Sequence, residues 1–138
     1  MWTWRNTPTP HRPAKAIRAN EWMKQGQEYE AQHRHSSAMN AYEHAARSPD
    51  GATAAAANYC LGRLYEERHR YTAAVKAFRR AANCTDRGLR TSANYHLGRL
   101  YEHRHHSVPA IVAYRRAVRS GTGSDAHRAQ DALARLGG

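Results

Sequence analysis

Two pairs of side chains with the same spacing could bind an anionic partner. Tyr59 lies four residues before Arg63, and Tyr95 lies four residues before Arg99. On a helix, this spacing places an aromatic ring and a planar guanidinium group side by side, one turn apart. A protein segment that offers carboxylates between apolar side chains would fit such a surface.

A structural role for the same two arginines is the alternative. Glutamates that could neutralise them lie close by in the sequence: Arg63 could pair with Glu66 or Glu67, and Arg99 with Glu102. Residues three or four apart on a helix are neighbours on its surface, so such pairs need no partner protein. The sequence leaves both interpretations open.

A second group of basic side chains could bind phosphates. Its members recur near the ends of predicted helices: Arg79, Arg80, Arg115, Arg116 and Arg119. Positive charge is favoured at a helix C-terminus by the helix dipole, so this placement also has a purely structural explanation. Nucleic acid binding through this basic surface is the alternative function, although no known RNA-binding or DNA-binding motif accompanies it.

Histidines and cysteines raise the question of a metal site. His33, His69 and His105 occupy equivalent places in three predicted turns. Equivalent atoms of neighbouring helix pairs lie on the order of 10 Å apart, whereas zinc binds nitrogen at about 2 Å, so this column cannot close on one ion. Cys60 and Cys84 fit no metal-ligand spacing and are expected to be buried or half-buried free thiols of a reducing compartment. We therefore expect no metal and no cofactor.

Motifs of catalysis are missing from the sequence as well. It contains no Gly-rich phosphate loop, no nucleophile elbow and no paired-carboxylate constellation. The chain is therefore expected not to be an enzyme.

A duplicated segment indicates which elements position these side chains. NYCLGRLYE at 58–66 recurs as NYHLGRLYE at 94–102, an offset of 36 residues, and the same offset extends backward to a third copy. Each copy predicts two helices. The second helix carries an apolar stripe at helical spacing, as in Ala74, Phe78 and Ala81. The sequence thus predicts an all-α fold built from three helix pairs.

Small and polar residues of each copy have predicted structural roles. Glycines at equivalent positions let a neighbouring helix approach closely: Gly26, Gly62 and Gly98. Hydroxyl side chains before the second helices are the predicted N-caps: Ser36 or Ser37, Thr72 and Ser107.

These residues resemble the tetratricopeptide repeat, whose pattern W-x2-L-G-x2-Y, A-x3-F and Pro lies on a helix–turn–helix unit of about 34 residues. The matching positions are Trp22, Gly26, Tyr29, Ala38 and Tyr42 in the first copy; Leu61, Gly62, Tyr65, Ala74 and Phe78 in the second; Leu97, Gly98, Tyr101, Ala110 and Tyr114 in the third. The chain departs from the pattern at Gln25, which replaces the Leu, and at Asn58 and Asn94, which replace the Trp. Sel-type repeats rank second, because their longer Gly-rich turn is absent here.

The resemblance implies an α-solenoid with a concave groove, lined by the first helix of each repeat, that receives a peptide or helix of a partner. The positions that would face this groove are Met23, Gln27, Tyr59, Arg63, Tyr95, His96 and Arg99. The family's Lys and Asn clamp for chaperone C-termini is not matched, since Met23, Gln27, Cys60 and His96 stand there. The chain is therefore expected to be a non-catalytic interaction module, adaptor or scaffold that binds an acidic peptide or helix.

The offset of 36 residues also divides the chain into units. Residues 1–18 form a basic, Pro-containing tail with Trp2 and Trp4, and residues 19–121 hold three repeats, at about 19–54, 55–90 and 91–121. Residues 122–138 predict a capping helix that starts at Ser124 or Asp125 and covers the last repeat, since open repeat ends need a cap. About seven helices result.

The composition indicates which kind of partner and which cellular location to expect. The 138 residues carry a net charge of +11, and 19 of the 22 basic residues are arginine, which suits an acidic or polyanionic partner. A general preference for Arg over Lys is the alternative explanation. No segment reaches the about 18 apolar residues of a membrane span, and no hydrophobic signal core begins the chain, so a cytoplasmic protein without a membrane partner is expected. Nothing in the sequence indicates the oligomeric state.

Overall fold

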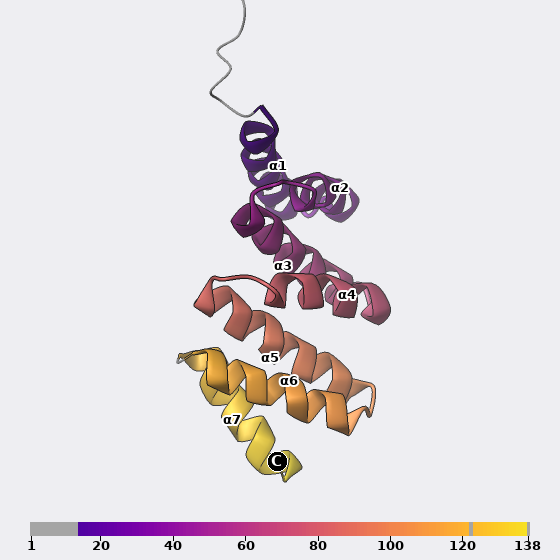
Figure 1. Cartoon of the computed structure of the whole chain (residues 1–138). Coiled ribbons are helices and arrows are strands. Elements are labelled where there is room, and N and C mark those ends of the chain that lie inside the picture. The colour runs from indigo at the N-terminus through magenta and orange to yellow at the C-terminus, as the bar shows by residue number, and fades with distance from the viewer. Residues whose placement is uncertain (1–13, 122, 138) are drawn as a thin grey trace, which may run out of the picture.

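The computed structural model describes residues 14–121 and 123–137, and Trp2 and Trp4 of the predicted tail lie outside them. This part of the chain is all-α, as predicted, and forms seven helices (Figure 1): α1 (Ala14–Ala31), α2 (His35–Ala46), α3 (Gly51–Glu67), α4 (Tyr71–Ala82), α5 (Arg87–His103), α6 (Ser107–Ser120) and α7 (Ser124–Leu136). None of the described helices is long and apolar enough to cross a membrane. Residues 14–18, which the repeat arithmetic assigns to the tail, already belong to α1.

The helices pack in chain order, which gives a solenoid-like arrangement. Each helix contacts the next one along the chain, and the first helices of successive pairs, α1, α3, α5 and α7, also touch in sequence. Figure 1 shows the stack running from α1 at one end to α7 at the other. Because neighbours in space are neighbours in sequence, each pair buries its apolar face against the next pair.

The predicted apolar stripes form the core. Every residue of the stripe on α4, namely Ala74, Ala77, Phe78 and Ala81, is buried. The helix α7 buries Ala129, Ala132 and Leu133 against α6, as expected of a helix that covers the last pair. Small alanines dominate these faces, so the helices of a pair can lie close together.

Three glycines make the closest contact in each pair. A Cβ atom added there would lie 2.5 to 2.7 Å from a ring carbon of the second helix, in the pairs Gly26 with Tyr42, Gly62 with Phe78, and Gly98 with Tyr114. Carbon atoms in contact ordinarily lie 3.5–4.0 Å apart. The prediction that these glycines permit close helix packing is confirmed.

Histidines at positive φ end the first helix of each pair. His33, His69 and His105 have φ values of 59°, 59° and 62°, the left-handed region that favours glycine. At the first turn, the amide of Arg34 donates to the Tyr29 carbonyl oxygen (2.8 Å) and the amide of His33 donates to that of Glu30 (3.0 Å). This is a Schellman motif, with histidine in the place where glycine is usual.

The N-caps predicted for the second helices are wrong. The helices α2, α4 and α6 follow Arg34, Arg70 and His106, and none of these three residues makes a side-chain cap hydrogen bond. The Schellman turn fixes where the chain leaves the first helix, so the next helix begins before the hydroxyl residues can act as caps, and Ser107 is its first residue. The predicted caps Ser36, Ser37 and Thr72 lie inside the first turns of α2 and α4.

Caps between the pairs come from aspartates that the sequence analysis did not identify. Asp50 accepts hydrogen bonds from the amides of Ala52 (3.4 Å) and Thr53 (3.3 Å) at the start of α3. Asp86 accepts one from the amide of Leu89 (2.9 Å) at the start of α5. Before α7 the cap position is held by Gly123, not by Ser124 or Asp125. The side chains of the two aspartates thus accept hydrogen bonds from amides that have no partner within the helix.

Replacing Gly98 by Ala should destabilise the protein, because its new methyl group would lie 2.5 Å from the Tyr114 ring. Overpacking of this kind costs about 1–3 kcal/mol, measurable by urea denaturation. Gly51→Ala is the matched control, since nothing lies within 4 Å of a Cβ atom there. Equal stability of Gly98→Ala and the parent would show that the close contact is not needed.

Replacing His105 by Gly should stabilise the protein. Left-handed backbone costs a non-glycine residue about 1–2 kcal/mol, while glycine loses about 0.5–1 kcal/mol in chain entropy, so a gain of up to about 1 kcal/mol is expected in thermal denaturation. His127→Gly, in the exposed helical backbone of α7, should instead lower the melting temperature. A loss of stability in both variants would contradict the strain argument.

Candidate functional site

The first predicted surface lies on α1, α3 and α5. These helices carry all seven residues that were expected to line a groove: Met23, Gln27, Tyr59, Arg63, Tyr95, His96 and Arg99. The Tyr59 hydroxyl and His96 Nε2 are 3.2 Å apart, which ties α3 to α5. The guanidinium of Arg99 lies 5.8 Å from the centre of the Tyr95 ring, so the predicted pairing of an arginine with a ring exists on α5.

Both arginines of this surface pair with glutamates of the preceding helix pair. Arg63 Nη2 lies 3.1 Å from Glu30 Oε2, and Arg99 Nη2 lies 3.9 Å from Glu66 Oε2. The expected alternative partners, Glu66 or Glu67 for Arg63 and Glu102 for Arg99, are not the ones used. Each bond instead reaches from one first helix back to the previous one.

The capping helix continues the same series. Arg135 on α7 pairs with Glu102 on α5. The three pairs, Glu30 with Arg63, Glu66 with Arg99 and Glu102 with Arg135, are each separated by 33 residues and are called here the glutamate–arginine ladder. Such charges are partly exposed, so the ladder orients the first helices more than it stabilises them.

Tyrosine hydroxyls of the second helices hold the ladder carboxylates. Tyr42 donates to Glu30 Oε1 (2.7 Å), and Tyr114 donates to Glu102 Oε1 (2.8 Å). Burial, together with the hydrogen bond to the nearby carboxylate, raises the pKa of both phenols, so they remain protonated donors. Each of these carboxylates thus accepts a hydroxyl from its own pair and a guanidinium from the next.

The middle pair of the ladder, Glu66 with Arg99, differs from the other two. The aromatic residue of its second helix is Phe78, which has no hydroxyl to donate. His96 stacks on the Phe78 ring with centroids 4.9 Å apart, and its Nδ1 lies 3.5 Å from Glu66 Oε1 without an aligned hydrogen bond. Burial acts to raise the pKa of Glu66, but His96 and Arg99 outweigh it and the pKa is lowered. The predicted groove residues His96 and Arg99 therefore both lie against a glutamate of the protein itself.

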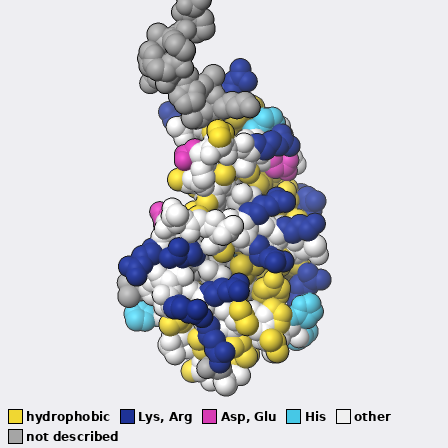
Figure 2. Space-filling view, in the orientation of Figure 1, with side chains coloured by type: hydrophobic (Ala, Val, Ile, Leu, Met, Phe, Trp, Pro, Cys, Tyr) yellow, Lys and Arg dark blue, Asp and Glu magenta, His cyan; other side chains and the backbone are white. Residues whose placement is uncertain are grey.

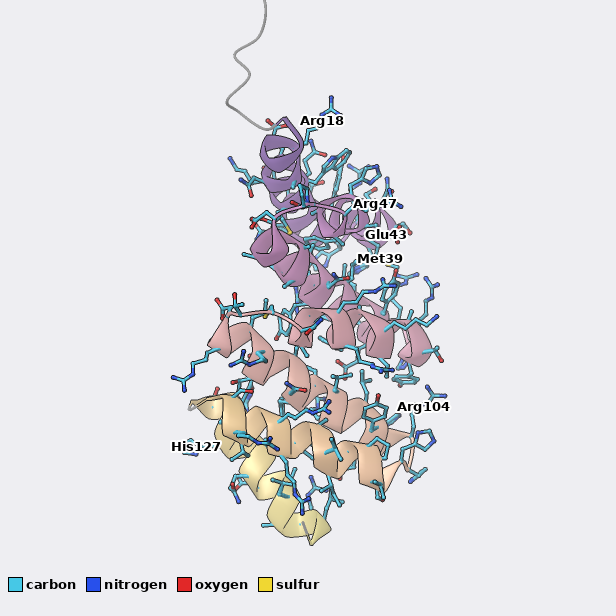
Figure 3. The ribbon with its side chains drawn as sticks, in the orientation of Figure 1. Arg18, Met39, Glu43, Arg47, Arg104 and His127 are labelled. Carbon is cyan, nitrogen blue, oxygen red and sulfur yellow. The ribbon has the colours of Figure 1, made fainter. Side chains whose placement is uncertain are left out.

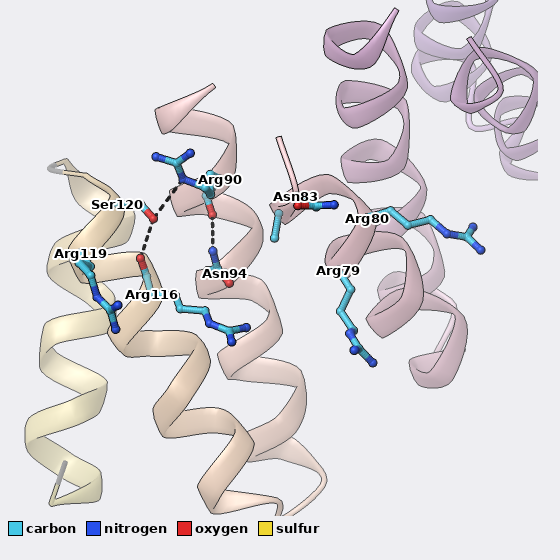
Figure 4. Close-up of a pocket in the computed structure, with 9 residues that line it drawn as sticks. Arg79, Arg80, Asn83, Arg90, Asn94, Arg116, Arg119 and Ser120 are labelled. Carbon is cyan, nitrogen blue, oxygen red and sulfur yellow. Dashed lines mark hydrogen bonds between the residues drawn. The ribbon is translucent and has the colours of Figure 1, made fainter. Parts of the chain in front are cut away.

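The second predicted surface is a basic pocket between α4 and α6. Five arginines line this pocket of about 680 Å³, together with Asn83, Asn94, Ala82 and Ser120 (Figure 4): Arg79, Arg80, Arg90, Arg116 and Arg119. Four of the five residues expected on the basic surface are among them. The fifth, Arg115, does not line the pocket, and Arg90 takes part although the sequence analysis did not identify it.

No carboxylate neutralises this basic pocket in the described part of the chain. Its lining contains no acidic residue, and none of the ion pairs found among the described residues includes a pocket arginine. Arg90 is held in place, since it donates to Ser120 Oγ (3.4 Å) and to the Cys84 carbonyl oxygen (3.2 Å). Like charges held close together repel one another, and an anion would relieve that repulsion.

An asparagine anchored on α5 lies at the floor of the basic pocket. Asn94, only 4% exposed, donates from Nδ2 to the Arg90 carbonyl oxygen (3.0 Å). In Figure 4, the side chains of Arg79 on α4 and Arg116 on α6 extend on the two sides of the pocket, while Arg80 points away from the others.

Apolar side chains continue the pocket toward the turn between α5 and α6. A second hollow shares Arg79 and Arg116 with the basic pocket and is otherwise lined by Leu97, Tyr101, Val108, Pro109, Val112 and Ala113. The two hollows together are called here the α4–α6 groove. Figure 2 shows Lys and Arg side chains spread over this face, with hydrophobic side chains exposed beside them.

The corresponding pocket one repeat earlier differs in its charge, because its lining combines Glu43 with the basic residues Arg47, Lys76 and Arg80. Glu43 on α2 occupies the position equivalent to Arg79, and it accepts a hydrogen bond from the Tyr65 hydroxyl (3.3 Å). Figure 3 shows Glu43 between Met39 and Arg47 along α2. The change from an acidic to a basic residue at this single position of the repeat was readable in the sequence and marks the α4–α6 groove.

Cysteines and histidines form no further site among the described residues. No group of three or more His, Cys, Asp or Glu residues could hold a metal ion there. Cys60 and Cys84 are free and half-buried, as predicted, and burial raises the pKa of the Cys60 thiol. A buried thiol with a raised pKa is a poor nucleophile.

Comparisons with known proteins found no match: no family model fits the chain, and no curated protein sequence is similar to it.

Acid should weaken the ion pair between Glu102 and Arg135. The hydrogen bond from Arg135 lowers the pKa of Glu102 below its ordinary value of 4.5, so the carboxylate contributes stability above that pH and loses it as pH falls through the lower, folded value. Glu102→Gln should therefore show a smaller loss of melting temperature between about pH 5 and pH 3 than the parent. Glu67→Gln, at an exposed position outside the ladder, is the control and should follow the parent. Parallel curves for all three proteins would contradict this role of Glu102.

Proposed function

We propose that this chain is a non-catalytic interaction module, built from tetratricopeptide-like repeats, that binds an acidic segment of another protein in the α4–α6 groove. One observation carries the proposal: five arginines line a pocket whose lining has no acidic residue. The arginines of the expected concave surface, Arg63 and Arg99, are by contrast engaged with glutamates. The proposed partner chemistry is therefore the one expected from the sequence, on a different surface.

A carboxylate ligand suits the arrangement of the arginines. Guanidinium groups bind carboxylates through two parallel hydrogen bonds, and Arg79 and Arg116 offer theirs from opposite sides of the groove. A charge-assisted hydrogen bond contributes about 1.5–3 kcal/mol. Two such bonds would supply much of the free energy of binding. The net charge of +11 would also raise the rate of association with an acidic partner.

Nucleic acid is the alternative ligand for the same arginines. Nucleic acid gains most of its affinity from basic side chains that neutralise successive phosphates. The groove instead changes from basic to apolar within two turns of α6, where Val112 and Pro109 replace arginines as lining residues. This change favours a protein segment, because a segment can carry both carboxylates and aliphatic side chains.

Loss of the groove arginines should remove binding of an acidic probe. A fluorescein-labelled peptide of about twelve residues with four consecutive glutamates is titrated by fluorescence anisotropy against Arg79→Gln with Arg116→Gln. The affinity should fall about tenfold or more, since two charge-assisted contacts are lost. Arg63→Gln with Arg99→Gln, which removes the same charge, is the matched control and should bind nearly as the parent does.

Three other results would contradict the proposal. A stronger effect of the Arg63 and Arg99 control would return the site to the concave surface. Tighter binding of a twelve-nucleotide RNA than of the peptide, with the same dependence on Arg79 and Arg116, would favour nucleic acid. Equal losses in both variants that vanish at moderate salt would mean that only the net charge attracts the probe.

A further inference from the structure

The two halves of the α4–α6 groove differ in chemistry. The basic half holds Arg90 and Arg119, the apolar half holds Val108 and Val112, and Arg79 and Arg116 belong to both. Because Arg79 and Arg116 line both halves, the halves adjoin one another and a single ligand can reach both.

The apolar half exposes two large hydrophobic side chains that lie one turn apart on α6. Val108 is 74% exposed and Val112 is 40% exposed, and they are the only large hydrophobic side chains so exposed among the described residues. Leu97 and Ala113 form the buried floor beneath them, beside half-buried Tyr101. Exposed apolar side chains beside charged ones are typical of binding sites.

Comparison with the preceding repeat shows that these valines are not required by the repeat. The positions equivalent to Val108 and Val112 are Thr72 and Lys76 on α4. Both α4 and α6 form the second helix of their repeats, although they carry different residues at these positions. The apolar half is therefore a feature of the third repeat alone, while the basic half differs from the preceding pocket in having no carboxylate in its lining.

Resting on the proposed function, we infer that the ligand is bipartite: an acidic cluster binds between Arg79, Arg116 and Arg119, and an aliphatic side chain of the same segment packs on Val108 and Val112. Charge complementarity identifies the segment as part of another protein. A second copy of this chain, at +11, would bring more positive charge to the groove.

The helix geometry sets the spacing of the two parts of the ligand. Val112 and Arg119 lie seven residues apart on α6, which at about 1.5 Å per residue is roughly 10 Å. An extended peptide advances about 3.3 Å per residue, so roughly three residues separate the acidic cluster from the aliphatic one. Apolar contact in a desolvated groove adds affinity that salt does not screen.

Three labelled peptides test the inference on the full chain. The first has four glutamates, three serines and then Leu-Ile; the second replaces Leu-Ile by Ser-Ser; the third replaces the glutamates by glutamines. The first should bind the parent about tenfold tighter than the second, as burial of two aliphatic side chains predicts. The third should bind more weakly than the first by a similar factor. The advantage of the first over the second should persist at high salt.

Two substitutions copied from the preceding repeat provide the variant. Val108→Thr with Val112→Lys installs the residues found at Thr72 and Lys76, and the lysine adds a positive charge. In this variant the first and second peptides should bind equally, because the apolar half is gone. Binding by charge alone would instead leave the first peptide bound as tightly as before, or more tightly.

The outcomes separate this inference from the proposed function. Equal affinity of the first and second peptides for the parent would refute the bipartite ligand, while a loss in Arg79→Gln with Arg116→Gln would still support the acidic-segment function. No effect of the arginine variant on any peptide would refute both. The comparison of peptides on the parent protein needs no folded variant, and circular dichroism with thermal melting verifies that each variant is folded.

Discussion

Contact between a glycine and an aromatic ring determines how the two helices of each pair meet. The ring of Tyr114 lies where a Cβ atom of Gly98 would be, so any larger residue would push α5 and α6 apart. This close approach also brings the tyrosine hydroxyl to Glu102, which it holds at 2.8 Å. The carboxylate is then in place to receive Arg135 from α7. Packing within a pair and orientation between pairs therefore depend on the same ring.

The ladder leaves the arginines of the two predicted surfaces in different electrostatic surroundings. On the first helices, each of Arg63, Arg99 and Arg135 has a glutamate within the protein. On the second helices and the adjoining part of α5, Arg79, Arg116 and the other groove arginines have none among the described residues. The groove arginines therefore keep a positive charge that no carboxylate in the lining of the basic pocket neutralises. This distribution supports the proposed site for an anionic ligand more directly than the net charge does.

Local patterns predicted the helices, their buried stripes, the glycine contacts and the terminal helix, because each depends on spacing within one repeat. Features that depend on three-dimensional contacts were missed. Thr72 is a good N-cap residue, yet the left-handed turn at His69 ends one helix and starts the next before Thr72. The partner of Arg63 is Glu30, because a side chain of one repeat reaches the previous repeat and not only its own helix. The pocket was only partly foreseen, since Arg90 and Asn94 join it from α5 while Arg115 does not line it.

Differences between equivalent positions are more informative here than the repeated ones. Glycines and rings recur because every pair needs them, so they say nothing about a ligand. Glu43 gives way to Arg79, and Thr72 and Lys76 give way to Val108 and Val112, all along one groove. None of these three changes is needed for packing, since the equivalent helices fold with either residue. Changes that packing does not require, gathered on one surface and matched in chemistry to a single kind of ligand, are best explained by a binding role for that surface.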